Sequence, residues 1–482
     1  MNKLLLLMIT VFSLNFNAQE NLLDTSYGTS NGFTNFTFYN GGQVTGGLHI
    51  QSTAKMPDGK ILAVGVGLIA RFTANGVLDT TFNGTGYKLS LSGNYGGLQP
   101  TPDGNYIFMD GENKEIRKID ADGNPVSGFT PFNQTGHLYL DSTGKIYLLK
   151  ENNGVYSIIR LLSNGIKDAA FTEINLGSTY KYNRIRVNSN NEIFVVGKQV
   201  LSVNSGKIVV TKITASGTVD LTFGNGGHFL YTGGEYVGNS NDLTLLDDGK
   251  ILGLTSGNLC SGIIGPDCFG LIMYRLLPNG VLDTTFKNGG VSVVSIQGSS
   301  TPTLMVRHQD GSYIISGNGM RTFYAIKIDS NGNLDPNFGT NGKIITPALA
   351  PDGYPVYNQG FELYGNSIVF AGLYSIFSGG QLKYVGTLRK YFFNIGGLNT
   401  SEVDRHTTVK VYPNPVRDYL NFQSRETVSR FEIYDQNGRH VISDKSMSLK
   451  NAVDVSGLIP GVYFINLFDN KGVLSSTKFV KQ

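Results

Sequence analysis

The sequence contains no tryptophan, only two cysteines and few charged residues. Lys, Arg, Asp and Glu make up 16% of its 482 residues, whereas an average globular chain is about a quarter charged. A coiled coil is excluded, because such chains consist about half of Ala, Glu, Lys, Leu and Arg. Beyond the N-terminal segment, no stretch approaches the roughly 18 uninterrupted apolar residues that a membrane-spanning helix needs. We therefore expect no transmembrane segment in the mature chain.

The net charge of +3 is small and unevenly distributed. Residues 407–482 carry 10 Lys and Arg against 7 Asp and Glu, so the rest of the chain is neutral overall. Proteins that bind nucleic acid neutralise many phosphates with clustered basic residues. We therefore expect no nucleic-acid partner.

Glycine and the aromatic residues are abundant. The chain has 62 glycines, close to twice the usual share of about 7%. They follow no Gly-X-Y period, which excludes collagen, and 25 Tyr with 28 Phe exclude a disordered polar chain. This composition and length favour an all-β, turn-rich protein with more than one domain.

The N-terminus has the pattern of a secretory signal peptide. Met1–Lys3 is a short basic start, Leu4–Leu14 is apolar, and Ala18 precedes Gln19 as a small residue suited to cleavage. The apolar run is too short to span a bilayer. We predict a signal peptide of residues 1–18, cut between Ala18 and Gln19, and an exported mature protein.

The two cysteines, Cys260 and Cys268, are eight positions apart in a Gly/Pro-rich segment. Export permits disulfides, so we expect a local disulfide here. Two free buried thiols and a redox pair are the alternatives. A loop this short gains about 2–3 kcal/mol from closure at most, enough to stabilise one loop. The segment is also the longest insert of the repeat described next, which makes it a candidate functional loop.

A Leu-Asp-x-x-Phe phrase recurs between residues 22 and 393. The aromatic residues of its strong and weak copies have a mean spacing of about 52 residues and are Tyr27, Phe82, Phe129, Phe171, Phe223, Phe286 and Phe338. Between successive copies, a turn such as Asp58-Gly59 leads into an apolar strand, and a further strand runs into an Asn75-Gly76 type of turn. Such dipeptides between β-rich runs predict hairpins, so each unit holds about four short strands.

Repeats near 50 residues with four strands are typical of β-propeller blades. The first phrase has no strands before it, and the last strands have no phrase after them. We therefore predict a seven-bladed ring across residues 19–393, in which the N-terminal strand completes the last blade and removes the exposed sheet edges. Six or eight blades are the alternatives.

The repeat resembles the delta-sixty repeat β-propeller family. The resemblance rests on phrases such as Leu282-Asp-Thr-Thr-Phe286 and Asp58-Gly-Lys-Ile-Leu62, and covers about residues 22–393. It implies a propeller fold and supplies no catalytic residues.

A separate module follows a polar linker at residues 394–406. Residues 407–482 contain about seven short alternating strands, which predict a small immunoglobulin-like β-sandwich.

This module resembles the type A C-terminal sorting domain of the type IX secretion system. The resemblance rests on a set of landmarks that includes Tyr412, Pro413, Asn414, Pro415, Gly461, Tyr463, Lys478, Phe479 and Lys481. It implies the type IX machinery as a partner, a secreted or outer-membrane cell-surface location, and a Bacteroidetes-type bacterium. An ordinary accessory sandwich is the alternative.

The search for chemistry assigns no catalytic, cofactor-binding or metal-ligating residue. The six histidines lack the close spacing that would place two nitrogens on one metal. Asp329, Asn331, Asn333 and Asp335 alternate as in calcium loops, but they coincide with the turn and phrase of the repeat. We expect their side chains to cap backbone amides instead.

Basic residues occupy corresponding positions in the units, namely Arg71, Lys118, Arg160, Lys212, Arg275, Lys327 and Arg389. They could line a channel and attract an anion. We favour the alternative, in which each pairs with a nearby Asp of the repeated phrase, such as Asp79.

These observations predict a binding or adhesion module that contacts surface glycans or an extracellular protein. The alternative is a secreted polysaccharide-degrading glycosidase or lyase, which would need two carboxylates about 5–10 Å apart. Functional residues of either kind should break the symmetry of the repeat and lie together at one rim or in the channel.

Overall fold

The computed structural model divides the chain into two compact units, Met1–Asn394 and Ile395–Gln482. Each is described by itself below. The described residues are 22–36, 49–202, 205–231, 242–258, 269–287, 289–296, 301–319, 321–349, 356–378, 381–393, 410–423, 428, 430–435, 440–444, 452–469 and 472–482. The predicted positions 1–18 (with Ala18), Gln19, Cys260, Cys268 and 394–406 therefore lie outside them.

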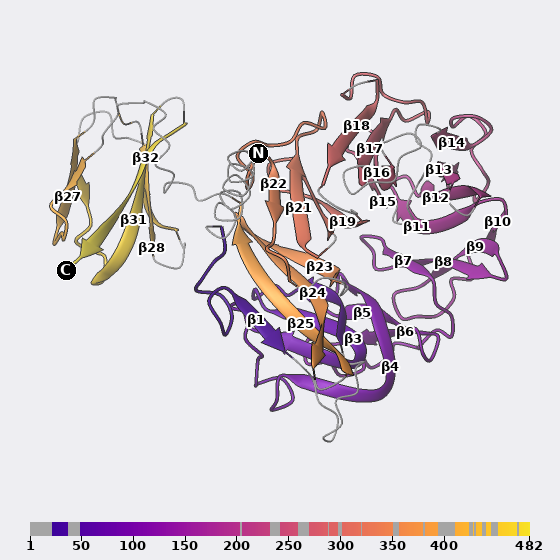
Figure 1. Cartoon of the computed structure of the whole chain (residues 1–482), viewed down its shortest axis with the longest axis horizontal. Helices are drawn as coiled ribbons and strands as arrows, with labels where there is room; N and C mark the ends of the chain where they lie inside the picture. Colours follow the sequence, from indigo (N-terminus) through magenta and orange to yellow (C-terminus); the bar gives the residue numbers. More distant parts are fainter. Residues whose placement is uncertain are drawn as a thin grey trace, which may run out of the picture. The chain divides into compact units, whose positions relative to one another are not determined.

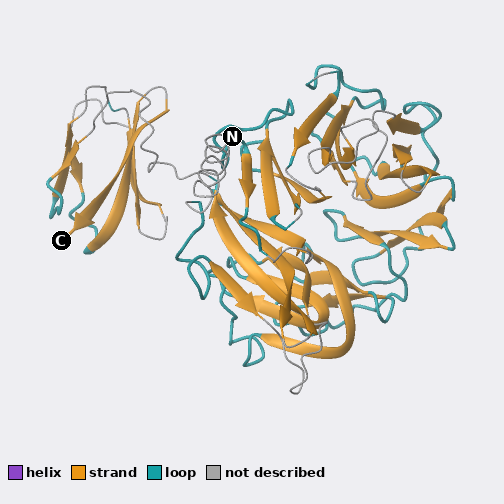
Figure 2. Cartoon of the chain, in the orientation of Figure 1, coloured by secondary structure: helices purple, strands orange, loops and turns teal. Residues whose placement is uncertain are grey.

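Every regular element of the described residues is a β-strand (Figure 2), so the expectation of an all-β chain is confirmed. Within those residues, no helix is long and apolar enough to cross a membrane.

Four-stranded antiparallel sheets make up most of the N-terminal unit (Figure 1). One sheet consists of β7 (His137–Leu140), β8 (Ile146–Asn152), β9 (Val155–Leu161) and β10 (Ile174–Gly177). The next consists of β11 (Lys181–Val187), β12 (Ile193–Ser202), β13 (Ser205–Ile213) and β14 (His228–Tyr231). It is followed by β15 (Asp242–Leu245), β16 (Ile251–Asn258), β17 (Phe269–Leu276) and β18 (Val291–Ser295). Then come β19 (Thr301–Arg307), β20 (Tyr313–Asn318), β21 (Phe323–Ile328) and β22 (Lys343–Ile345).

A five-stranded sheet precedes these along the chain. Its strands are β2 (His49–Lys55), β3 (Ile61–Phe72), β4 (Tyr87–Pro100), β5 (Tyr106–Asp110) and β6 (Glu115–Ile119). Strand β4 serves two neighbours, because Tyr87–Asn94 pairs with β3 and Tyr95–Pro100 pairs with β5.

The last sheet of this unit joins its two ends. Its order is β1-β25-β24-β23, from β1 (Phe33–Phe36), β23 (Val356–Tyr364), β24 (Ser367–Ser378) and β25 (Gln381–Phe392). In Figure 1 the indigo β1 lies beside the orange β25, and Phe33 is paired with Arg389. The N-terminal strand thus completes the last sheet, as the repeat predicts.

The strand that begins each repeat contacts the corresponding strand of the next repeat. We call these the first strands, and they are β2, the second half of β4, β7, β11, β15, β19 and β23. Contacts connect them in that order, and β23 in turn contacts β2. The first strands therefore surround a common centre.

Aromatic residues of the repeated phrase pack against turn glycines of the next repeat. Phe286 is fully buried, and Gly332 of the next repeat lies so close that a Cβ on it would be 2.5 Å from the Phe286 ring. Gly332 also has a φ of +78°, which favours glycine. The same contact joins Gly76 to Tyr27 and Gly280 to Phe223. The Asn-Gly turns thus serve both hairpin geometry and close packing.

Ion pairs occupy the basic positions of the repeat, as we favoured. Arg71, Arg160 and Arg275 each donate from Nε to the phrase aspartate at 2.8 Å, and the lysine pairs are Lys212–Asp220 at 3.1 Å and Lys327–Asp335 at 2.9 Å. Lys118 pairs instead with Asp103 at 2.6 Å.

In the last sheet, the predicted residue was wrong by one position. Lys390, not Arg389, pairs with Asp24 at 3.0 Å, because the Asp24 amide donates to the Lys390 carbonyl as Asp79 does to Arg71. Arg389 lies over the ring of Phe33 instead. The pair joins residues from both ends of this unit.

The C-terminal unit contains two antiparallel sheets around one core. One consists of β26 (Lys410–Tyr412), β27 (Tyr419–Gln423) and β30 (Ala452–Asp454). The other consists of β28 (Arg430–Asp435), β29 (His440–Asp444), β31 (Gly461–Asp469) and β32 (Gly472–Lys481). Buried side chains from both sheets, including Leu420, Ile433 and Ile465, form a single apolar cluster.

Candidate functional site

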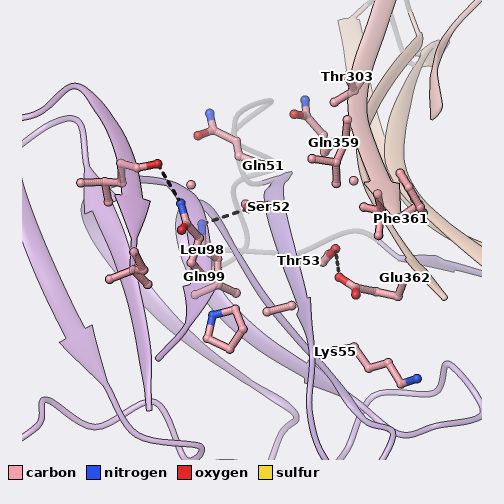
Figure 3. Close-up of a pocket in the computed structure, with 18 of the residues that line it drawn as sticks. Gln51, Ser52, Thr53, Lys55, Leu98, Gln99, Thr303, Gln359, Phe361 and Glu362 are labelled. Atoms are coloured by element: carbon pink, nitrogen blue, oxygen red, sulfur yellow. Dashed lines mark hydrogen bonds between the residues drawn. The ribbon is translucent and has the colours of Figure 1, made fainter. Parts of the chain in front are cut away.

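Six of the seven first strands line a cavity of about 820 Å³ (Figure 3). Its walls come from β2, β4, β7, β11, β19 and β23, which are spread over most of the N-terminal unit. Side-chain hydrogen bonds connect neighbouring walls. Tyr139 donates to the Val187 carbonyl at 2.9 Å, and the Gln99 amide donates to the Leu138 carbonyl at 3.3 Å.

Strand register shows which positions of the seven first strands correspond to one another. We count back one residue from the partner of the first apolar residue of each second strand, and these apolar residues are Ile61, Tyr106, Ile146, Ile193, Ile251, Tyr313 and Ile368. The level reached in this way contains Ala54, Gln99, Tyr139, Arg186, Thr244, Val306 and Glu362. The next level contains Ser52, Gly97, His137, Arg184, Asp242, Leu304 and Gly360. Side chains at alternate positions share one face of a strand.

Apart from Glu362 on β23, the His, Arg, Asp and Glu residues of these two levels lie on three consecutive first strands, β7, β11 and β15. His137, Arg184 and Asp242 are consecutive at the second level, whereas its remaining members are Ser, Gly or Leu. Arg186 lies two residues after Arg184 on the same strand, β11. This asymmetry is what we expected of functional residues, and it was missed from the sequence alone. Aligning the first strands in register would have shown it.

Arg184 is a half-buried guanidinium without a carboxylate partner among the described residues. Its Nη1 donates to the Asn183 carbonyl at 2.9 Å and lies 3.4 Å from Nδ1 of His137. Burial lowers the pKa of Arg184. Burial, together with the Arg184 charge, also lowers the pKa of His137 to about 4, so the imidazole is neutral at pH 7.

Arg186 is neutralised by its neighbour. Its Nη2 donates to Oδ1 of Asp242 at 2.6 Å, and its Nη1 donates to the Ile185 carbonyl at 2.9 Å. Asp242 is only 4% exposed. The pair therefore fixes the Arg186 side chain between β11 and β15.

Glu362 lies on β23, in a different wall from the two arginines. Thr53 donates to its Oε1 at 2.8 Å, across the junction of β2 and β23 (Figure 3). Burial raises the pKa of Glu362 to about 7, although Thr53 and Lys55 act in the opposite direction. The carboxyl group is thus partly protonated at neutral pH. Lys55 Nζ donates to the Leu363 carbonyl at 2.6 Å.

Amide side chains complete the lining. Gln51 and Gln359 project into the same space from neighbouring strands, with Thr303 nearby (Figure 3). Each glutamine lies at an irregularity in the pairing of its strand with the second strand of the sheet. Gln51 lies between Ile50 and Ser52, and Gln359 lies between Asn358 and Gly360. Such bulges re-aim side chains. The cavity therefore combines amide and hydroxyl groups with two arginines.

The suspected calcium-like segment has a structural role. Oδ1 of Asp329 accepts the backbone amides of Asn331 and Asn333, both at 2.8 Å. Oδ2 accepts the Asn333 side-chain amide at 2.8 Å. Oδ1 of Asp335 accepts the Asn337 amide at 3.0 Å, so the prediction of backbone capping is confirmed for the two aspartates. The described residues contain no group of acidic, His or Cys side chains that could hold a metal ion.

The residues of the C-terminal motif lie around the last strand of their unit. The Asn414 side chain donates to the Lys478 carbonyl at 3.1 Å and accepts the Val480 amide at 2.9 Å. Phe479 is fully buried and stacks on Tyr463 with ring centroids 5.7 Å apart. Tyr412, Pro413 and Pro415 are exposed, as is Lys478, whereas Gly461 is half-buried and Lys481 is buried. The motif thus has both structural and surface members.

Two family models match the chain. Residues 410–482 match the secretion system C-terminal sorting domain, and residues 57–82 match a β-propeller domain of unknown function, DUF5122. The protein is therefore exported to the cell surface or secreted, by the type IX system, and its repeat is of the β-propeller kind. The comparison with curated proteins finds no match.

Solved structures of low identity resemble the chain. A catalytically inactive virginiamycin B lyase from Staphylococcus aureus, with quinupristin, is 13% identical, with 74% of this chain and 99% of that chain covered and a TM-score of 0.44. A streptogramin B lyase is 13% identical, with 74% and 98% covered and a TM-score of 0.43. A protein of unknown function from Dyadobacter fermentans is 12% identical, with 75% and 99% covered and a TM-score of 0.38. None of them carries an assignment of activity to this chain.

Proposed function

We propose that this protein is a secreted or cell-surface binding module, and that its ligand occupies the cavity lined by the first strands. In this proposal the N-terminal unit is a closed seven-bladed propeller, with the five-stranded sheet counting as two blades that share β4. The C-terminal unit is an immunoglobulin-like sandwich that serves as the export address. The signal peptide cut after Ala18 and the Cys260–Cys268 disulfide remain part of the proposal.

One observation carries the binding role. The residues that line the cavity differ from sheet to sheet, whereas purely structural positions would repeat. Arg184 corresponds to Ser52 and Leu304 of other sheets, and Arg186 corresponds to Ala54 and Val306. The lining also holds three glutamines, Gln51, Gln99 and Gln359. Amide and guanidinium groups suit the hydroxyl and acidic groups of glycans, so we propose surface or environmental glycans as the ligand class.

A polysaccharide-degrading enzyme is the second candidate, favoured by Glu362 alone. A half-buried carboxyl group with a pKa of about 7 is suited to general acid–base catalysis at neutral pH. Glu362 is the one carboxylate among the described residues that line the cavity. The pairs of carboxylates used by most glycosidases would require a second one.

A glycan array distinguishes the two candidates. The purified chain is applied to neutral and acidic polysaccharides, and both retention and released oligosaccharides are scored. We expect retention without products. Products that disappear in Glu362→Gln would replace the binding role with the enzyme, and a complete lack of retention and products would contradict both.

A further inference from the structure

We propose that the corner formed by Arg184 and His137 binds an anionic group of the ligand, the carboxylate of a uronic acid or the sulfate of a sulfated sugar. The inference rests on the proposed glycan-binding role and names its ligand class.

The first argument is the charge left over at Arg184. The nearby Asp242 is already bound by Arg186 at 2.6 Å, and its second oxygen is buried without a hydrogen-bond partner among the described residues. Arg184 forms no ion pair within the described chain, and the pKa of its guanidinium stays lowered despite the Asp242 charge. A partly desolvated charge without an ion-pair partner is unfavourable, and an anionic ligand would compensate it.

The second argument is hydrogen-bonding capacity. A guanidinium has five N–H donors in a planar fork that matches carboxylate and sulfate oxygens. Within the part of the chain that the structure describes, Arg184 Nη1 contacts the carbonyl of its own neighbour Asn183 and Nδ1 of His137. The neutral imidazole of His137 can donate one further hydrogen bond from a ring nitrogen. Tyr139 and Gln99 follow on the adjoining wall of the same cavity.

The third argument is the composition of the remaining walls. Leu304 on β19 and Gly360 on β23 occupy the positions that correspond to Arg184. Because neither has a polar side chain and Gly360 has none at all, these two walls leave space for a ligand and add no charge. The carboxyl group of Glu362 is on β23 and bound to Thr53, and its raised pKa of about 7 reduces its negative charge. Repulsion of an anion from that side is therefore weakened.

The test compares ligands that differ only in the acidic group. Calorimetry is performed on the purified full chain with a galacturonate trimer, a sulfated galactose trimer and a neutral galactose trimer. We expect one of the two acidic oligomers to bind at least about tenfold more tightly than the neutral oligomer, and the preferred one identifies the acid. Hydrogen bonds to a charged group of this kind are worth about 10- to 100-fold in affinity.

Substitutions assign the effect to the corner. Arg184→Gln should weaken binding of the acidic oligomer by about 10- to 100-fold and leave any binding of the neutral one unchanged. Arg184→Lys keeps the positive charge but lacks the planar fork of donors, so its affinity for the acidic oligomer should lie between those of the wild type and Arg184→Gln. The matched control is Arg307→Gln, on β19, because Arg307 is half-exposed, bound to Asp247 at 2.7 Å and outside the cavity lining.

The outcomes separate the inference from the function on which it rests. Equal binding of neutral and acidic oligomers, or an unchanged affinity in Arg184→Gln, would overturn the anionic site while the glycan-binding role stands. If no oligomer binds, but sulfate or galacturonate at matched ionic strength raises the melting temperature of the wild type and not of Arg184→Gln, the anionic site stands and the glycan role fails. If neither oligomers nor these anions have any effect, both are wrong.

Discussion

At the scale of single residues, the charged side chains of the repeated phrase differ from those of the cavity in how well their charge is compensated. Charged residues of the repeated phrase are paired and hydrogen-bonded, as in Asp283, which Arg275, Lys250 and Thr285 all contact. Burial alone would raise the pKa of Asp283, but these contacts lower it to about 2. The charged cavity residues Arg184 and Glu362 are instead half-buried, and neither forms an ion pair among the described residues. Stability is often lower at such sites because function requires them.

Glu362 gives a prediction about pH. Its folded pKa of about 7 is above the ordinary value of 4.5, so the folded state favours the protonated carboxyl. The stability of the wild type should therefore fall as pH rises from about 4.5 to 7 at this group, and Glu362→Gln should remove that loss. We expect the variant to be more stable at pH 8.5, by about 3 kcal/mol at most.

Urea unfolding of both proteins at pH 4.5 and pH 8.5 measures this difference. At the lower pH the two free energies of unfolding should agree, because the wild-type carboxyl is then protonated and glutamine mimics it. A gain of equal size at both pH values would show that the effect is packing, not titration.

At the scale of elements, turn glycines of one sheet pack against aromatic rings of the neighbouring sheet. Both Gly332 and Gly84 have a positive φ, of 78° and 71°. Only Gly332 faces a neighbouring aromatic ring, whereas a Cβ on Gly84 would meet nothing within 4 Å. The pair therefore separates backbone strain from close packing.

We expect Gly84→Ala to destabilise the protein by about 1 kcal/mol, the cost of a left-handed backbone for alanine. Gly332→Ala should cost about 2–4 kcal/mol, because its Cβ also overlaps the Phe286 ring. Thermal and urea unfolding of the two variants measure the difference. Equal losses would mean that the contact between sheets adds nothing to stability.

At the scale of the whole molecule, the N-terminal unit is held by a junction between its ends. Strand β1 pairs with β25, the Leu23 backbone forms a bridge with Tyr391, and Asp24 pairs with Lys390 at 3.0 Å. Removing this segment would expose the edge of β25, a strand of 12 residues. Exposed strand edges favour aggregation.

Two truncations test the importance of this junction. A chain that begins at residue 37 should lose its cooperative unfolding transition and aggregate, whereas a chain that ends at residue 394 should keep the transition of the N-terminal unit within a few degrees. The second variant is the control, because the C-terminal residues form a separate compact unit. Calorimetry checks both, and a normal transition in the first variant would show that β1 is dispensable.

The sequence by itself determined the β class, the repeat and the export address. These properties depend on local patterns, such as Asn-Gly turns that need positive φ and a C-terminal motif of consecutive landmarks. It also anticipated the pairing of Arg71 with Asp79, because both recur at a fixed short distance along the chain. The same reasoning chose Arg389 in place of Lys390, because an error of one residue in the register of a strand cannot be detected until the paired strand is known.

Only the tertiary structure decided which residues share the cavity. Thr53 and Glu362 are 309 positions apart and lie 2.8 Å from each other, and His137 reaches Arg184 from a different sheet. No local pattern brings them together, because the contact exists only when the first strands are arranged around one centre. Burial in that centre also shifts the pKa of Glu362 and of His137, which depends on the surrounding walls and not on either residue's neighbours in sequence.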